Sequence, residues 1–467
     1  MMGNRMSKRP PLYPTDPIEG RHLTELVAEM GREWDDHELR DLDIAMALNI
    51  PPNRISHFKR AKSSIEGGSE VEGEDRGDTA ESSQIPMVHP HQAILMRLLM
   101  RFPEYALLVK RPTNEEVWEL IKDMTPKPAV SQRKRAQGTE GEVEKKGFAP
   151  LFGRAAVSSY KMLPGEDSSA NGETSLPVIR LEMLILNRLA DIFREIYQRY
   201  AANYMFAMDR KNPLYEPASR GWTVLRERDS LTAWMTEQTL DQFYGEVKTQ
   251  WEDWFNNVYL ETLRREAVSR GKDPEEVIRE GNWTAREPVT EEEYRSYPRS
   301  CKPITGSKAS ALSEFRESGN MTSAEFFWVL GMQVKGFYRY RDRGETRIDA
   351  ATALLVRHFQ SWQSDLRYFV PDSPDGAWIL SKIQGIDPNF KRSQLAPLFG
   401  ASKIASYKFS AEDTPCPYFA RRLATIFARE LERGPEIYWH LRECVEDEVE
   451  ARGLDLTEFW KDGKWHK

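Results

Sequence analysis

Apolar residues recur along most of the chain at the three- and four-residue spacing of amphipathic helices. The segments 92–102, 180–206 and 230–271 show this spacing most clearly, and the last begins at a serine suited to capping and ends at a glycine. No segment keeps the period-two alternation of a half-buried strand. The sequence therefore predicts an essentially all-α fold.

Three polar segments interrupt the helical pattern, all in the first half of the chain. Residues 63–84 are acidic and rich in Gly and Ser, residues 125–147 are rich in Pro, Lys and Glu, and residues 163–177 form an insertion. These segments hold too few apolar side chains to offset the loss of chain entropy on ordering. We expect flexible linkers there and a disordered tail over residues 1–20.

One 14-residue segment occurs twice. APLFGRAAVSSYKM at 149–162 returns as APLFGASKIASYKF at 396–409, with eight identical positions. Downstream, NRLADIF at 187–193 matches RRLATIF at 421–427, and the separation is 13 residues smaller, which the insertion explains. Self-similarity of this kind indicates a tandem duplication.

The segment 321–359 reads as a helix, a glycine turn and a second helix. Thr322 is placed to cap the first helix, Gly331 follows its end, and Phe337 and Tyr340 take the inner positions of the second. This pattern resembles the Cro/lambda-repressor type of helix-turn-helix domain, the Xre-like family. The resemblance implies that the segment binds double-stranded DNA.

In such domains the second helix enters the major groove, so its outer side chains carry the contacts. Glutamine and arginine suit bidentate contacts with adenine and guanine, and the basic residues at the end of the helix are placed for phosphate. The outer residues that the resemblance assigns to DNA are Gln333, Lys335, Tyr338, Arg339, Arg341 and Arg343.

The segment 38–64 fits the same template 282 positions earlier. Asn49 stands where Gly331 stands, and asparagine also tolerates the left-handed conformation. The resemblance again implies a DNA-contacting second helix. Its predicted contacts are Asn53, Arg54, Ser56, His57, Lys59 and Arg60.

The two APLFG motifs, 149–162 and 396–409, resemble degenerate versions of the same unit. Each has a short second helix with an apolar pair, Val157 with Tyr160 and Ile404 with Tyr407. Packing alone would explain the repeat, so the favoured interpretation places the Leu, Phe, Tyr and Ile side chains of the motifs in the core. Direct DNA contact is the alternative.

The two halves of the chain contain the same segments in the same order, because 92–121 also aligns with 352–383, at a separation of 260. Residues 206–320 belong to neither copy. The predicted division is a tail (1–20), a helix-turn-helix unit (21–64), a linker (65–88), a helical connector (89–126), a linker (127–147), an APLFG unit (148–205), a central helical region (206–320), an Xre-like unit (321–360), a connector with the second APLFG unit (361–440) and a C-terminal helix (441–467).

Composition narrows the function. The net charge of −7 over 467 residues argues against strong nonspecific binding of nucleic acid, but local basic faces remain compatible with it. Three cysteines without a C-x-x-C pair predict neither disulfides nor a metal site, and no phosphate-loop, dinucleotide or hydrolase motif occurs, so we expect no cofactor and no enzyme. No apolar run approaches the roughly 20 residues of a membrane span and no secretory signal is present, so we expect a cytoplasmic protein without membrane partners.

The leading hypothesis is a sequence-specific DNA-binding protein, a bacterial transcriptional regulator. Two alternatives stay open: an accessory protein of a plasmid or other mobile element, acting in transfer, replication or partition, and a helical protein-interaction scaffold without DNA binding. A homodimer through the central helices is a further option. The DNA hypothesis requires that the second helices of these units be exposed.

Overall fold

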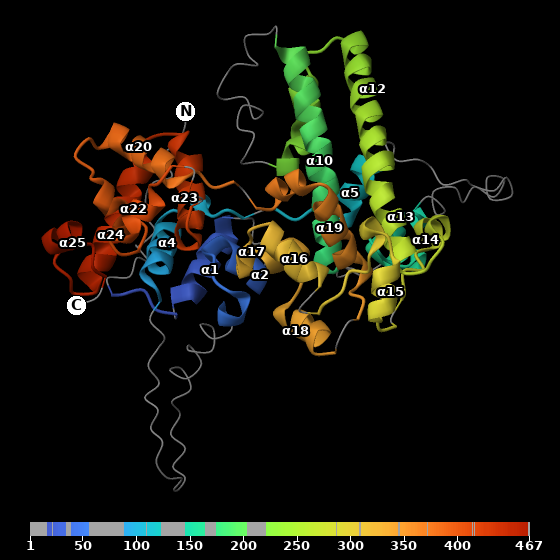
Figure 1. Cartoon of the computed structure of the whole chain (residues 1–467). Coiled ribbons are helices and arrows are strands. Elements are labelled where there is room, and N and C mark those ends of the chain that lie inside the picture. The colour runs from blue at the N-terminus through green and yellow to red at the C-terminus, as the bar shows by residue number, and fades with distance from the viewer. Residues whose placement is uncertain are drawn as a thin grey trace, which may run out of the picture. The chain divides into compact units, whose positions relative to one another are not determined.

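The computed structural model describes residues 16–465 except 21, 34–38, 56–87, 109, 123–144, 164–173, 203–220, 286, 308–309, 344–345, 371, 413 and 415. The all-α prediction is confirmed (Figure 1): in the described part of the chain no strand occurs, and extended residues pair only in isolated bridges. The α-helices of the first half are α1 (His22–Glu33), α2 (Asp41–Leu48), α4 (Pro90–Arg101), α5 (Asn114–Ile121), α8 (Phe148–Leu151), α9 (Ser159–Met162), α10 (Leu176–Ala201) and α11 (Arg228–Thr232).

The helices that follow are α12 (Glu237–Trp254), α13 (Leu260–Ser269), α14 (Pro274–Glu280), α15 (Glu291–Ser296), α16 (Ala311–Ser318), α17 (Ser323–Leu330), α18 (Val334–Asp342), α19 (Ala350–Ser361), α20 (Gly376–Ile386), α21 (Leu395–Leu398), α22 (Ala405–Phe409), α23 (Tyr418–Leu431), α24 (Glu436–Ala451) and α25 (Leu456–Asp462). A π-helical turn, η5 (Phe255–Tyr259), joins α12 to α13. Shorter 3-10 turns are η1 (Pro103–Tyr105), η2 (Ala156–Ser158), η4 (Gly221–Glu227), η6 (Arg299–Cys301), η7 (Gln363–Tyr368) and η8 (Arg392–Gln394). Residues 1–15 of the predicted tail and most of the predicted linkers lie outside the described residues. The prediction of a disordered tail is wrong where the structure describes it, because Ile18 is buried in the core and its N–H donates to Glu448 Oε2 at 3.4 Å.

Two compact units share the chain, and each combines segments that are far apart in the sequence. Unit 1 comprises Met1–Leu108, Thr322–Glu325 and Pro371–Lys467, and unit 2 comprises Val109–Met321 and Phe326–Val370. The connector helix of the first half, α4, therefore shares a unit with the second APLFG motif. The connector helix of the second half, α19, shares a unit with the first APLFG motif.

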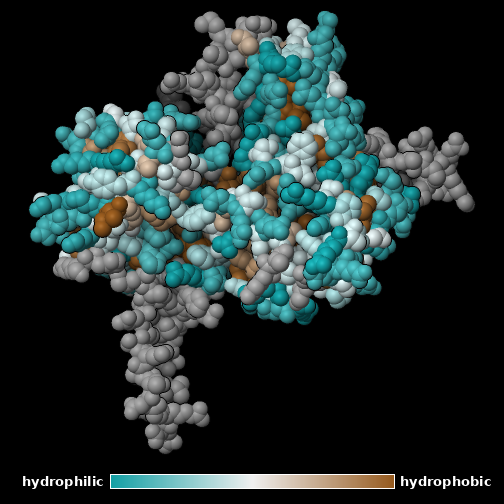
Figure 2. All heavy atoms as spheres, in the orientation of Figure 1, coloured by the Kyte–Doolittle hydropathy of each residue, from teal (hydrophilic) through white to brown (hydrophobic). Residues whose placement is uncertain are grey.

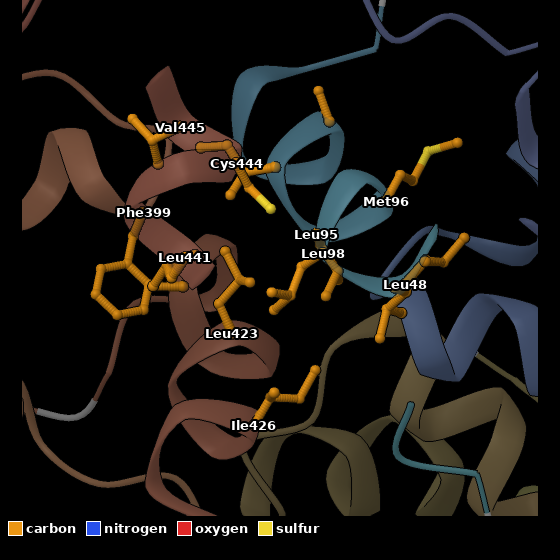
Figure 3. Close-up of a cluster of buried hydrophobic side chains, with 14 of the residues drawn as sticks. Leu48, Leu95, Met96, Leu98, Phe399, Leu423, Ile426, Leu441, Cys444 and Val445 are labelled. Atoms are coloured by element: carbon orange, nitrogen blue, oxygen red, sulfur yellow. The ribbon is translucent and has the colours of Figure 1, made fainter. Parts of the chain in front are cut away.

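The core of unit 1 forms where α4 packs against α23 and α24. Figure 3 shows Leu95 and Leu98 of α4 near Leu423 of α23 and near Leu441 and Cys444 of α24. All of these side chains are buried, and removing each from water stabilises the fold by about 1.5–3 kcal/mol.

Helix α10 is the main packing element of unit 2. It contacts α12, α19 and η4, and α13 contacts α19 and α14. Phe193 of α10 meets Phe243 of α12 edge to face, with 5.3 Å between the ring centroids. Helices of the predicted central region thus form part of the core of unit 2.

A buried ion-pair cluster fixes α4 in unit 1. Arg97 Nε donates to Glu448 Oε2 at 2.6 Å, and both side chains are fully buried. Arg452 Nε donates to the other oxygen of Glu448 at 2.7 Å, and its Nη2 donates to the carbonyl of Val88 at 3.0 Å. One carboxylate therefore neutralises two buried guanidinium groups.

Unit 2 contains the same cluster at corresponding positions. Glu266 of α13 accepts from Arg357 Nη2 at 2.7 Å and from Arg270 Nε at 2.7 Å, and Arg270 Nη2 donates to the carbonyl of Ile348 at 2.7 Å. Arg357 lies 260 positions after Arg97, the separation at which the two connector helices align in the sequence. Paired contacts of this kind are what a tandem duplication predicts.

The glycine of each APLFG motif rests on a connector helix. Gly153 and Gly400 have φ of +73° and +81°, and a Cβ on Gly153 would lie 2.7 Å from Ala351 N. A Cβ on Gly400 would lie 2.3 Å from His91 N. His91 and Ala351 also correspond at a separation of 260, so the two turns make the same contact with the start of α4 or α19.

One further match between the two halves becomes visible in the structure. SRGKDPEEVIREGNW at 269–283 corresponds to ARGLDLTEFWKDGKW at 451–465, at a separation of 182. A Cβ on Gly281 would lie 2.9 Å from Ala156 N, and a Cβ on Gly463 would lie 3.1 Å from Lys403 N. Both nitrogen atoms belong to the backbone that follows an APLFG turn. The interpretation that 206–320 belongs to neither copy missed this correspondence.

The helices that follow the APLFG motifs correspond in a different register from the one inferred from the sequence. Arg180 of α10 donates from Nε to Trp328 O at 2.8 Å, and Arg422 of α23 donates from Nη2 to Met46 Sδ at 3.2 Å. These arginines are 242 positions apart, whereas the matching sequences 187–193 and 421–427 are 234 positions apart. Eight residues make roughly two helical turns, so both registers place apolar residues on nearly the same face.

Candidate nucleic-acid interface

Helix α17 has the start and the end that the sequence predicts. Thr322 Oγ1 accepts from Glu325 N at 3.2 Å, and Thr322 N donates to Glu325 Oε2 at 2.8 Å, which is a capping box. The helix ends at Leu330, and Gly331 follows with φ of +59°. A Cβ on Gly331 would lie 2.5 Å from Leu176 C, so both the turn and the close approach require glycine.

Aromatic side chains hold α18 on its inner side. The ring of Phe337 packs edge to face against the rings of Phe326 and Phe327, with 6.0 Å and 5.7 Å between the ring centroids. Tyr340 lies against the backbone of Gly306, where an added Cβ would come within 2.4 Å of Tyr340 Cβ. The two predicted inner residues therefore face α17 and its surroundings, but they are half-buried rather than buried.

The outer side of α18 is open to solvent. Lys335, Tyr338 and Arg339 follow the i, i+3, i+4 spacing of one helical face. Figure 2 shows a mainly hydrophilic surface over α18. Each residue that the sequence assigned to DNA contact on this helix is exposed: Gln333, Lys335, Tyr338, Arg339, Arg341 and Arg343.

Most of the positive charge on α18 is not neutralised locally. Among the described side chains, no carboxylate forms an ion pair with Lys335, Arg339 or Arg343. Arg341 pairs with Asp342 at 3.0 Å, but both side chains are well exposed, so the pair contributes about 0–1 kcal/mol and yields readily to a phosphate. The helix thus presents exposed cations to solvent.

The segment 38–64, which is the counterpart of 321–359 in the first half, also has a helix, a left-handed turn and the start of a second helix in its described part. Asn49 ends α2 with φ of +50°, and its Nδ2 donates to Tyr418 O at 2.6 Å. The next helix begins at Pro52, and both Asn53 and Arg54 are exposed on it. Outside the described residues lie the other four predicted contacts: Ser56, His57, Lys59 and Arg60.

The APLFG motifs correct one prediction. Their phenylalanines are buried as expected, but the predicted core placement of the Tyr and Ile positions is wrong. Ile404 is 84% exposed and Tyr407 59%, and in the first motif Val157 is 73% exposed and Tyr160 46%. Figure 2 shows a hydrophobic patch near α22 on a mainly hydrophilic surface. The second helix of each motif, η2–α9 or α22, therefore presents an apolar and aromatic outer face.

Other candidate chemistry is enclosed. His358 Nε2 and Asp365 Oδ2 lie 2.9 Å apart, and both side chains are buried, so solvent does not reach the pair. In the described part of the chain, no group of three or more His, Cys, Asp or Glu side chains is arranged to hold a metal ion. Nor does any described helix combine the length and the apolar character that crossing a membrane requires.

Glu182 of α10 is a buried carboxyl group without a counter-charge. Its side chain is fully buried, and neither oxygen has a hydrogen-bond partner among the described residues. Burial, reinforced by the negative charge of Glu115, raises the pKa of Glu182 well above its ordinary value of 4.5. The folded chain therefore favours the protonated form.

Replacing Glu182 by glutamine is expected to stabilise the protein at neutral pH. Because the folded-state pKa is raised, the carboxyl group supports folding fully below about pH 4.5, and this support is lost as the pH rises through the folded-state pKa. Glu182→Gln should gain about 1–3 kcal/mol at neutral pH and nothing in acid, measured by urea unfolding across the pH range. Glu195→Gln is the control, because Glu195 is exposed on the same helix. If the free energy of unfolding of Glu182→Gln and of the wild type depends on pH in the same way, the prediction is wrong.

No protein-family model matches this chain, and no curated protein and no solved structure matches it. The resemblance to Xre-like domains therefore rests on the residue patterns of 38–64 and 321–359 alone.

Proposed function

We propose that the chain is a sequence-specific DNA-binding protein that regulates transcription in the bacterial cytoplasm. The outer face of α18 carries the proposal: Lys335, Tyr338 and Arg339 are exposed together on one side of a second helix. The left-handed turn at Gly331 and the aromatic contacts of Phe337 fix that helix from the other side. An exposed second helix held in this way is what major-groove binding requires.

The local charge supports the same function. Residues 333–343 contain four basic side chains and one acidic one, in a chain whose net charge is −7. The basic character is therefore a property of this face and not of the whole chain, which favours docking in one orientation. Within that orientation Arg339 suits guanine, Gln333 suits adenine, and Arg341 and Arg343 suit phosphate.

Selection of DNA from a random pool by the full-length chain tests the proposal. We expect one family of sequences to be enriched at moderate salt. Arg339→Ala should lower the affinity for the selected site by about 5- to 150-fold and relax one base position, because a bidentate base contact is lost. Arg343→Ala should weaken binding to all sequences alike and reduce the salt dependence by about one counterion.

A matched control separates base reading from a general loss of charge. Arg199 of α10 is an exposed arginine, 52% accessible, that belongs neither to α18 nor to an APLFG motif. Arg199→Ala removes the same charge and should leave both affinity and sequence preference unchanged. Absence of any enriched sequence with the wild-type chain would disprove sequence-specific binding.

A further inference from the structure

The two APLFG motifs match on the surface as well as in the core. Tyr160 and Lys161 correspond to Tyr407 and Lys408, and all four side chains are exposed. Packing accounts for identical residues in the interior but not for identical residues in solvent, where a Tyr or Lys is freely replaced. A shared contact outside the chain accounts for both identities.

A buried serine sets the rotation of each second helix. Ser159 Oγ accepts from the backbone N–H ten positions earlier at 2.9 Å and donates to the carbonyl thirteen positions earlier at 3.0 Å. Ser406 makes the same two hydrogen bonds, each at 3.0 Å. Because each serine faces inward, the tyrosine one position later and the lysine after it face outward. The exposed face is thus fixed by hydrogen bonds that both motifs share.

The two chain segments that carry these faces are basic. Residues 145–163 contain four Lys or Arg and no Asp or Glu, and residues 390–410 also contain four and none. Lys146 Nζ lies 5.6 Å from the centre of the Tyr160 ring, and Arg392 Cζ lies 5.5 Å from that of Tyr407. In a chain of net charge −7, two segments without a carboxylate are complementary to a polyanion.

The side chains fit double-stranded DNA in particular. Each motif has a first helix, a left-handed glycine turn and an exposed second helix, the same order as α17, Gly331 and α18. The aliphatic residue of each face, Val157 or Ile404, and its tyrosine ring suit the methyl group of thymine, and the lysine suits phosphate.

We infer that both APLFG motifs read DNA, and that they read the same short base sequence because they present matched side chains. The target of the chain therefore contains one short element twice, with an A·T pair in each copy, in addition to the bases read by α18. This inference rests on the proposed function and deepens it.

Selection from a random DNA pool with four full-length variants tests the inference. The variants are Tyr160→Ala, Tyr407→Ala, the double variant, and Trp439→Ala, which removes an exposed aromatic residue elsewhere. The wild type should enrich sites that hold the same element twice. Each single variant should lose the requirement for one copy, with an affinity about 5- to 150-fold lower for the wild-type site. The double variant should keep only the Arg339-dependent bases, and Trp439→Ala should behave like the wild type.

Four results would overturn the inference. If the enriched sites depend on Arg339 but contain no repeated element, or if the tyrosine variants bind like the wild type, the APLFG motifs do not read DNA and the proposed function stands. If the double variant keeps its DNA affinity but loses self-association in sedimentation, the faces join two copies of the chain. If the wild type enriches nothing, the proposed function fails as well. Unchanged helical circular dichroism and unfolding midpoints verify that the exposed substitutions leave the fold intact.

Discussion

Replacing Glu266 by glutamine is expected to destabilise the protein by about 3–5 kcal/mol, because Arg357 and Arg270 would remain buried without a counter-charge. Both guanidinium groups lie within 2.7 Å of this carboxylate, and all three side chains are at most 4% exposed. Glutamine keeps the shape of the side chain, so packing is preserved and the lost charge dominates the effect. The shift of the urea-unfolding midpoint, followed by circular dichroism, measures it.

Two further substitutions make this prediction specific. Glu448→Gln removes the corresponding carboxylate of unit 1 and should cost a similar amount, since Arg97 and Arg452 lose the same partner. Glu261→Gln lies on α13 as well, but its carboxylate forms an exposed pair with Arg265, so it should change stability by less than about 1 kcal/mol. A cost for Glu266→Gln as small as that of Glu261→Gln would contradict the role assigned to the buried cluster.

The pH dependence adds a second check on Glu266. Burial alone would raise the pKa of this carboxyl group, but Arg357 and Arg270 outweigh burial and hold the pKa below its ordinary value of 4.5. A depressed folded-state pKa stabilises the fold above the unfolded-state value, and the contribution is lost as the pH falls through the folded-state pKa. The stability difference between wild type and Glu266→Gln should therefore be full at neutral pH and shrink in acid below about pH 4.5.

Local features of the fold were predictable from the sequence. The cap at Thr322, the turn at Gly331 and the inward position of Phe337 each depend on residues within one turn or one helix pair. Their geometry follows from short-range sterics and hydrogen bonds, which the residue types specify. Because Phe337 points inward, the helical period places Lys335, Tyr338 and Arg339 on the exposed side of α18.

Features that depend on distant contacts were not predictable. An apolar pair at i, i+3, such as Ile404 with Tyr407, has the same pattern whether its face is buried or open, so the sequence favoured the core. The pairing of α4 with the second APLFG motif joins segments about 300 positions apart, for which helical periodicity gives no signal. Segments 269–283 and 451–465 share the pattern R-G-x-D followed by G-x-W, but so few identical residues are not significant by themselves. The match is recognised because their glycines make equivalent contacts in the structure.

Replacing Gly400 by alanine is expected to destabilise unit 1 by about 2–5 kcal/mol. Its φ of +81° costs an L-residue about 1–2 kcal/mol. The added Cβ would also lie 2.3 Å from His91 N and 2.4 Å from His91 Cα, and a backbone neighbour cannot rotate away. The start of α4 must therefore shift, which costs a further 1–3 kcal/mol or so in a packed core. Urea unfolding followed by circular dichroism would measure the sum.

Gly453 separates the two causes, because it has nearly the same conformation without the contact. Its φ is +69°, and nothing lies within 4 Å of an added Cβ. Gly453→Ala should therefore show only the conformational cost of about 1–2 kcal/mol. Gly153→Ala, whose Cβ would lie 2.7 Å from Ala351 N, should resemble Gly400→Ala. Equal losses for Gly400→Ala and Gly453→Ala would mean that the APLFG turn does not press on the connector helix. The matched outer faces of the two motifs would then be held by their serines alone.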